Sequence, residues 1–87
     1  MDMQIAMQIA ETGTAEELDL IIDIQSIAQF ASDIAANKNA TAEQLTKLFN
    51  RGPINRVVDR NLSNNKNCPL HISCAAIVRY YKYEDCE

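Results

Sequence analysis

The residues of this chain that could do covalent or metal chemistry are its one histidine and the cysteines on either side of it. His71 lies three residues after Cys68 and three before Cys74. On a helix, a cysteine and a histidine three residues apart can meet as a nucleophile and its base. No acidic residue nearby would orient the histidine, and the spacing of the three is unusual for zinc ligands. We therefore expect no catalytic residue, no metal and no cofactor, with Cys74 in the core and His71 at the surface.

The cysteines also bear on the cellular compartment. Cys68, Cys74 and Cys86 are an odd number, and no two of them form a C-x-x-C pair. A disulfide framework is therefore not expected. No basic leader precedes an apolar run, and no apolar stretch approaches the roughly 18 residues that span a bilayer. These features predict a cytoplasmic protein with reduced thiols and no membrane partner.

The charges of the chain are distributed unevenly along the sequence. Residues 1–37 contain seven acids and no Lys or Arg, while residues 38–87 contain eight basic and five acidic residues. The first part is therefore −7 and the second +3, and the net charge is −4. We predict that the acidic part binds a protein with a basic surface, through a run of acids around the second helix: Glu16, Glu17, Asp19 and Asp23. The alternative is that Glu16 and Glu17 only favour the start of a helix.

A basic cluster around the fifth predicted helix supplies the competing hypothesis, which is nucleic-acid binding. Its members are Arg51, Arg56, Arg60 and Lys66. Arg56 and Arg60 are four residues apart, so they share one face of a helix and could contact phosphates or an acidic protein. The alternative is a solvated face that Asp59 partly neutralises. The net negative charge and the acidic first part of the chain disfavour nucleic acid.

Two groups of uncharged residues call for a structural explanation as well. Tyr80, Tyr81 and Tyr83 lie near the C-terminus, where their rings could cap the end of the fold or form an interface for a partner or a second copy. Asn61 falls on an apolar stripe. We expect its side chain to bond to the backbone of the adjoining turn, because a buried amide needs partners.

The chain is organised by an internal repeat. Its 87 residues allow one domain, 1–87, and contain only two glycines and two prolines. The sequence TAEEL at 14–18 returns as TAEQL at 41–45, and CPLHI at 68–72 takes the same place after a further 27 residues. The turn sequence NKN at 37–39 returns at 65–67, after 28 residues. Self-similarity at such a period is typical of stacked helical units.

The repeated segment begins a helix. Threonine at the N-cap and Glu or Gln three residues later form a capping box, and Pro69 suits the first helical position of the third copy. Apolar residues recur at helical spacing in the segments between these starts. The sequence therefore predicts an all-α fold of about six short helices with no strand: 2–11, 15–23, 26–36, 42–50, 53–63 and 69–82.

The turn and the helix that follows it resemble a known repeat family. The segment IAANKNATAEQLTKL at 34–48 is similar to the variant leucine-rich repeat, a relative of HEAT-like repeats, and NKNCP at 65–69 is similar to its Asn-x-Asn-Thr-Pro turn. The resemblance covers roughly residues 5–78, about two and a half units. NRVV at 55–58 only partly matches the family's Asp-x-x-Val-Arg sequence. The cysteine cluster that precedes some of these repeats is missing.

The resemblance implies a small right-handed α-solenoid that binds other molecules and has no catalytic residues to transfer. Such repeats occur in bacterial proteins and in small bacteriophage proteins. Together with the size and acidity of the chain, this suggests a non-enzymatic protein-interaction module, of the kind a phage uses as an inhibitor or adaptor against a host protein.

Overall fold

Six helices account for most of the chain. The computed structural model describes residues 3–23, 28–52 and 54–85, without the side chains of residues 28, 29 and 83–85. These residues form six α-helices and no strand: α1 (Met3–Thr12), α2 (Ala15–Ile21), α3 (Ala28–Ala36), α4 (Ala42–Asn50), α5 (Arg56–Asn64) and α6 (Leu70–Asp85). The predicted all-α fold and the number of helices are confirmed, and the predicted bounds differ from these by three residues at most.

The starts of α2 and α4 explain why threonine and Glu or Gln recur in the repeated sequence. Thr14 and Thr41 are the N-caps of α2 and α4, and each accepts a hydrogen bond from the backbone N–H three residues later. The side chains of Glu17 and Gln44 accept a bond from the cap's own N–H in return. Both predicted capping boxes are therefore confirmed.

The third copy begins differently from the prediction. Helix α6 starts at Leu70, and the Pro69 carbonyl accepts its first helical bond from the Ser73 N–H. Pro69 therefore takes the cap position instead of the first helical position. A proline fits there because the cap N–H takes no part in the helical hydrogen bonds.

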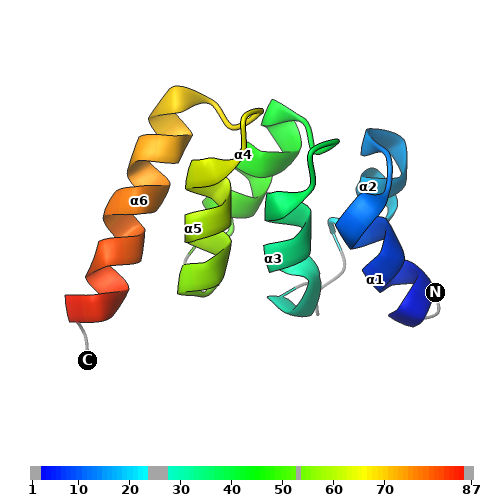
Figure 1. Cartoon of the computed structure of the whole chain (residues 1–87), viewed down its shortest axis with the longest axis horizontal. Coiled ribbons are helices and arrows are strands. Elements are labelled where there is room, and N and C mark those ends of the chain that lie inside the picture. Colours follow the sequence, from blue (N-terminus) through cyan, green and yellow to red (C-terminus); the bar gives the residue numbers. More distant parts are fainter. Residues whose placement is uncertain (1–2, 24–27, 53, 86–87) are drawn as a thin grey trace.

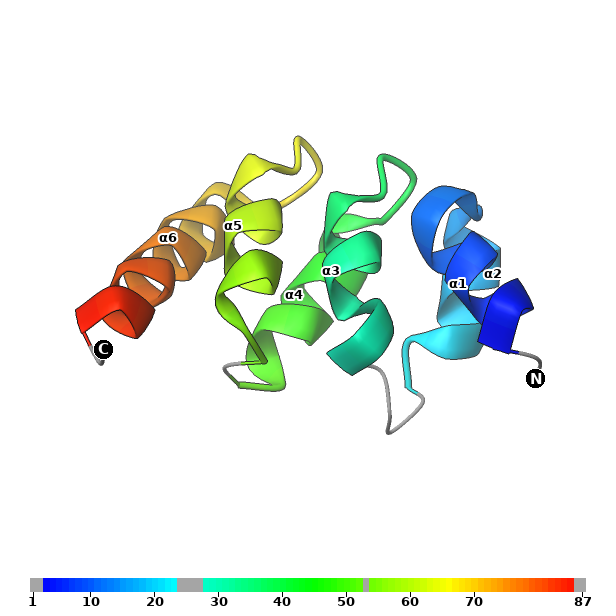
Figure 2. The same cartoon turned by 60° about the horizontal axis from the view of Figure 1, so that its bottom comes forward.

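The helices are arranged in two rows (Figure 1). Helices α1, α3 and α5 lie side by side in chain order, and α3 packs against both of its neighbours. Helices α2 and α4 lie behind this row, and α6 lies beside α5 on the side away from α3, as the second view also shows (Figure 2). The molecule measures 37 × 25 × 16 Å, with α1 and α2 at one end of its long axis and α6 at the other.

The core runs between the two rows and is continuous from α1 to α6. Its large, fully buried members include Leu18, Ile34, Leu45, Leu48 and Leu62. The buried residues of α1 and α3 include four alanines: Ala6, Ala10, Ala31 and Ala35. Small side chains let the helices of the front row approach closely.

Side-chain amides join the turns of the front row. The Nδ2 of Asn37 donates to the carbonyl oxygens of Ile9, Ala10 and Gly13, at 3.4, 3.1 and 3.2 Å. One turn later, the Nδ2 of Asn65 donates in the same way to Ala35 and to Asn37, at 2.8 and 3.0 Å. These bonds supply donors to carbonyls at the ends of α1 and α3 and in the turns that follow, where helical partners run out. The Ile9 and Asn37 carbonyls also accept backbone bonds, from Gly13 and Ala40.

The second asparagine of each turn adds a further bond. Asn39 donates from Nδ2 to the Gly13 carbonyl, and Asn67 donates to the carbonyls of Lys38 and Ala40. The backbone N–H groups of Asn39 and Asn67 bond to the side-chain oxygens of Asn37 and Asn65. Each Asn-x-Asn turn is thus bonded within itself and to the turn before it. We call this series of bonds the asparagine ladder.

Asn61 does not belong to the ladder, and the prediction for it was wrong. Its Nδ2 donates at 2.9 Å to the carbonyl of Ser32, in the middle of α3, and not to a turn. The repeat from α3 to α5 is 28 residues, so that buried Leu62, and not Asn61, matches buried Ile34. Asn61 is half-buried and faces α3 from the edge of the apolar stripe.

Candidate functional site

The four predicted acids lie on or next to α2 and are all exposed. Three of them have partners within the chain. Glu17 belongs to the capping box, and Asp19 accepts a bond of 2.7 Å from the Gln44 Nε2. Asp23 forms ion pairs with Lys47 at 2.7 Å and with Arg51 at 3.4 Å. The four acids therefore form an exposed acidic surface, but they differ in the number of contacts that they make within the chain.

Asp23 is the acid that the neighbouring helix neutralises. The hydrogen bond from Lys47 lowers the pKa of its carboxyl group below the ordinary value, and the charges of Lys47 and Arg51 act in the same direction. Both cations belong to α4 and the residue that ends it. The side chain of Glu16 is exposed and forms no hydrogen bond or ion pair with the described part of the chain.

Two shallow grooves flank α4 on its exposed side. One lies between α2 and α4 and is lined by Ala15, Asp19, Thr41 and Gln44 among others. The other lies between α4 and the start of α6, where Ala42, Thr46 and Pro69 line it. Glu43 and Lys47 border both grooves. Both are open surfaces and not enclosed cavities.

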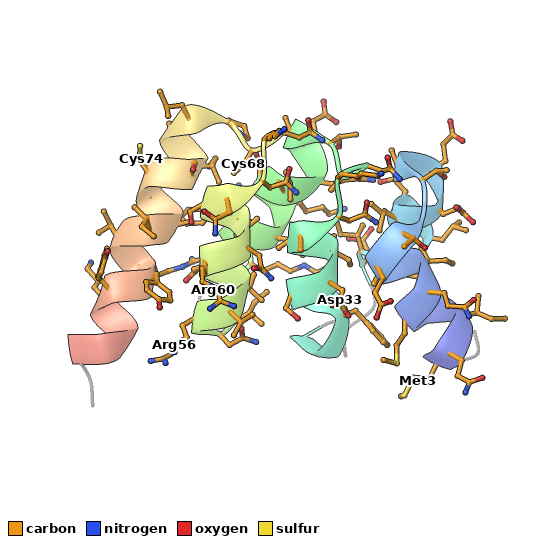
Figure 3. The ribbon with its side chains drawn as sticks, in the orientation of Figure 1. Met3, Asp33, Arg56, Arg60, Cys68 and Cys74 are labelled. Atoms are coloured by element: carbon orange, nitrogen blue, oxygen red, sulfur yellow. The ribbon has the colours of Figure 1, made fainter. Side chains whose placement is uncertain are left out.

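The four predicted basic residues are not brought together as one site. Arg51 faces Asp23 and belongs to the contact between α2 and α4. Arg56 and Arg60 lie along the exposed outer side of α5, as predicted from their spacing, and Lys66 is exposed in the turn after it (Figure 3). The basic surface available on α5 is thus smaller than the sequence suggested.

Asp59 is not part of that basic surface, contrary to the prediction that it partly neutralises it. Its side chain is fully buried and accepts two hydrogen bonds from Arg79 of α6. The distances are 2.9 Å from Nε to Oδ2 and 2.7 Å from Nη2 to Oδ1. The two-pronged geometry is the one in which a guanidinium matches a carboxylate best.

Arg79 connects three helices through this pair. Its Nη1 donates at 3.1 Å to the carbonyl of Phe49 in α4, and its guanidinium lies 4.1 Å from the centre of the Phe49 ring. A charged residue buried on an apolar helix face requires a charged partner. Asp59 lies on the same side of α5 as Val58 and Leu62, and that position was the signal in the sequence that our prediction missed.

The C-terminal helix exposes apolar residues on its outer face. Leu70, Cys74, Val78 and Tyr81 are exposed, and their spacing places them on one side of α6. The ring of Tyr80 is half-buried and meets Tyr81 edge to face, with centroids 5.6 Å apart. The side chain of Tyr83, the third predicted tyrosine, lies outside the described residues.

Two cysteines and the histidine of the described residues lie in the turn before α6 and on its first turns, and Cys86 lies outside the described residues. Cys68 and Cys74 are free thiols. Cys68 packs against the core, and its burial raises the pKa of the thiol. Cys74 is exposed, so the expectation that it lies in the core was wrong, while His71 is exposed as expected. Among residues 3–23, 28–52 and 54–85, no three His, Cys, Asp or Glu side chains are grouped as metal ligands would be.

None of the helices in the described ranges has the length and apolar content needed to cross a bilayer. Comparison of the chain with protein-family models, with curated proteins and with solved structures finds no match. The functional conclusion therefore depends on the residues and geometry of the chain itself.

Proposed function

We propose that the chain is a small right-handed α-solenoid, similar to variant leucine-rich repeats, that binds another protein and catalyses no reaction. The asparagine ladder supports the stacked arrangement, because equivalent turns of successive units bond to each other. Solenoids of this kind present continuous surfaces built from equivalent positions of neighbouring helices. The open grooves on both sides of α4 are consistent with such a surface.

One observation carries the choice of partner, a protein with a basic surface. Every charged side chain of the described residues of α1, α2 and α3 is acidic, and the cations nearest to α2 are Lys47 and Arg51 of the following unit. Both of these contact Asp23. Glu16 and Glu17 therefore keep the α2 side of the molecule negative, whereas Lys38 lines a shallow hollow together with Glu11.

A field of this kind acts mainly on association. Complementary charges raise the rate at which partners meet, and salt weakens the effect beyond a Debye length of about 8–10 Å. We therefore expect the acidic end to set the association rate and the apolar contacts to set the lifetime of the complex. In this proposal the protein is cytoplasmic and serves as a small inhibitor or adaptor, of the kind that phages direct against host proteins.

The experiment that tests this proposal compares two charge-reversing double variants. E11K/E16K changes exposed acids that form no ion pair in the described structure, so the fold should tolerate it. R56E/R60E is the matched control on α5. With a partner captured by the wild-type chain, E11K/E16K should slow association at low salt, and R56E/R60E should not. Equal association rates for E11K/E16K and wild type across a salt series would exclude the acidic surface.

Nucleic-acid binding through α5 is the second candidate. Arg56 and Arg60 share the outer side of α5, and buried Asp59 does not neutralise them. The amide groups of the nearby asparagine turns, however, donate to backbone carbonyls and are not available to read bases. Because affinity for phosphates grows with the number of cations, we expect no binding to duplex DNA at about 150 mM salt. A fluorescence-polarisation titration that showed R60E-sensitive binding at this salt would favour the second candidate.

A further inference from the structure

The outer face of α6 leaves apolar side chains uncovered. Leu70, Val78 and Tyr81 are 80%, 56% and 59% exposed, and exposed Cys74 lies between them on the same face. Among the helices that the structure describes, α5 lies alongside α6, on the side opposite this face (Figure 1). Scattered exposed apolar residues are ordinary, but four aligned on one helix face mark a contact surface.

We propose that this face pairs with the same face of a second copy of the chain, with the two α6 helices antiparallel across a twofold axis. The order of the side chains suits this symmetry. Leu70 and Tyr81 lie at the two ends of the stripe, and the smaller Cys74 and Val78 lie in its middle. An antiparallel pair therefore places Leu70 of each copy opposite Tyr81 of the other, with the small residues around the axis.

The charge distribution favours a second copy at this end. Residues 1–37 contain seven acids and no Lys or Arg. Pairing through α6 places these acidic ends at opposite extremes of the dimer, because α1 and α2 lie at the far end of a 37 Å long molecule. Repulsion over such a distance is screened by salt.

The chemistry of the stripe also favours a second copy over a different protein. None of its four residues is charged, so it offers no electrostatic guidance to a foreign partner. Interfaces between identical subunits are more apolar than those between independent proteins. This surface is separate from the acidic surface of the proposed function, and the failure of either proposal leaves the other intact.

The size of the stripe sets the strength of pairing. From Leu70 to Tyr81 it extends for about 16 Å along the helix axis. Two helices in contact over this length bury less than the roughly 1,200 Å² of a stable interface. We therefore expect a weak dimer whose population depends on protein concentration.

Sedimentation velocity of the full chain over a concentration series tests the proposal. The wild-type average mass should rise from that of one chain to that of two, and no further. V78E places a carboxylate at the axis and should weaken association more than about tenfold. L20E is the matched control, because Leu20 is 65% exposed but lies on α2 at the opposite end of the molecule. It should dimerise like the wild type.

A mixture of charge-swapped variants separates loss of pairing from loss of folding. V78E and V78K should each remain single chains, and an equal mixture of the two should form dimers, since the opposite charges meet near the axis. A wild type that is monomeric at all concentrations would overturn the proposal. So would association that grows beyond two chains, equal loss of pairing in L20E, or a V78E and V78K mixture that stays monomeric.

Discussion

Different interactions stabilise the contact between α3 and α5 and the contact between α5 and α6. At the first, small buried alanines allow close approach, and neutral amides of the ladder bond the two turns. At the second, α5 presents Asp59, which is 0% exposed and paired with Arg79. Asp59 occupies the place in the 28-residue repeat at which α3 has the buried Ala31.

The difference shows what each contact must specify. Repeated units need the same contact at each step of the stack. An asparagine amide that bonds to backbone carbonyls can form this contact in every unit, because it does not depend on the side chains of the neighbouring unit. Helix α6 instead lies beside α5, in line with the front row (Figure 2). A buried two-pronged ion pair, with Phe49 as a third point, fixes one orientation for that helix. In this protein, we infer, the pair acts by specifying the position of α6.

The largest effect should come from breaking the ion pair. R79M leaves a buried carboxylate without a partner, and we expect the free energy of unfolding to fall by about 3–5 kcal/mol. Urea denaturation followed by circular dichroism measures it. The double variant D59L/R79M removes both charges and should recover most of the loss. If R79M fails to fold, a folded D59L/R79M variant would still show that the unpaired carboxylate of Asp59 is the cause. A loss of stability in R79M as small as that of a surface ion pair would contradict the role of Asp59 and Arg79 as a buried pair.

The ladder should be the second most sensitive feature. Asn37 is 2% exposed and bonds to three carbonyls. N37A removes a donor from all three carbonyls and leaves that of Ala10 without its side-chain partner, so a loss of about 1–3 kcal/mol is expected. N39A is the matched control in the same turn, because the Asn39 side chain is exposed and donates one hydrogen bond, to the Gly13 carbonyl. N39A should lose less unfolding free energy than N37A in the same urea experiment. Equal losses would show that the buried bonds of Asn37 contribute no more to stability than the exposed bond of Asn39.

The capping boxes should contribute less than the ladder. T41A removes the side-chain acceptor for the Gln44 N–H and should lower stability by about 1 kcal/mol, within the usual range of about 0.5–2. T41S keeps the hydroxyl and is the control. Thermal denaturation of the three proteins gives the comparison, and a T41S loss as large as that of T41A would mean that the methyl group matters instead of the bond.

The smallest effect concerns Asp23 at the exposed side of α2. Its pKa is lowered in the folded chain by Lys47 and Arg51. Its contribution to stability is therefore fully present above the unfolded pKa of about 3.9 and is lost as the pH falls through the lower folded value. The difference in stability between wild type and D23N should shrink with acid and with salt. A difference that is constant from neutral pH to pH 3 would contradict the pairing with Lys47.

The sequence predicted the local features of the fold well. Thr14 with Glu17 and Thr41 with Gln44 identified two helix starts, because a capping box depends only on residues three positions apart. The same reasoning placed Glu16 and Arg60 at the surface. What could not be predicted depends on contacts between units.

The contacts that could not be predicted from the sequence all lie between different helices or turns. Asp59 and Arg79 are 20 residues apart, and helical periodicity does not tell which helix faces which. A repeat of 27 instead of 28 residues assigned Asn61 to the buried stripe, because one position turns a helical residue by about 100°. Asn37 and Asn65 suggested turns, but the bonds between those turns require the units to be stacked first.

The asparagine ladder has a direction, and the direction has a consequence for synthesis of the chain. The side-chain amides of Asn37 and Asn39 donate to carbonyls of residues 9–13, and those of Asn65 and Asn67 donate to carbonyls of residues 35–40. Each turn therefore closes onto a turn that the ribosome has already released. A unit that still lacks its successor leaves carbonyls that water can satisfy, whereas a unit without its predecessor would bury the Asn37 amide with no acceptor. We expect nascent chains stalled after α4 to resist proteolysis already, so that the protein consolidates in the order in which it is made.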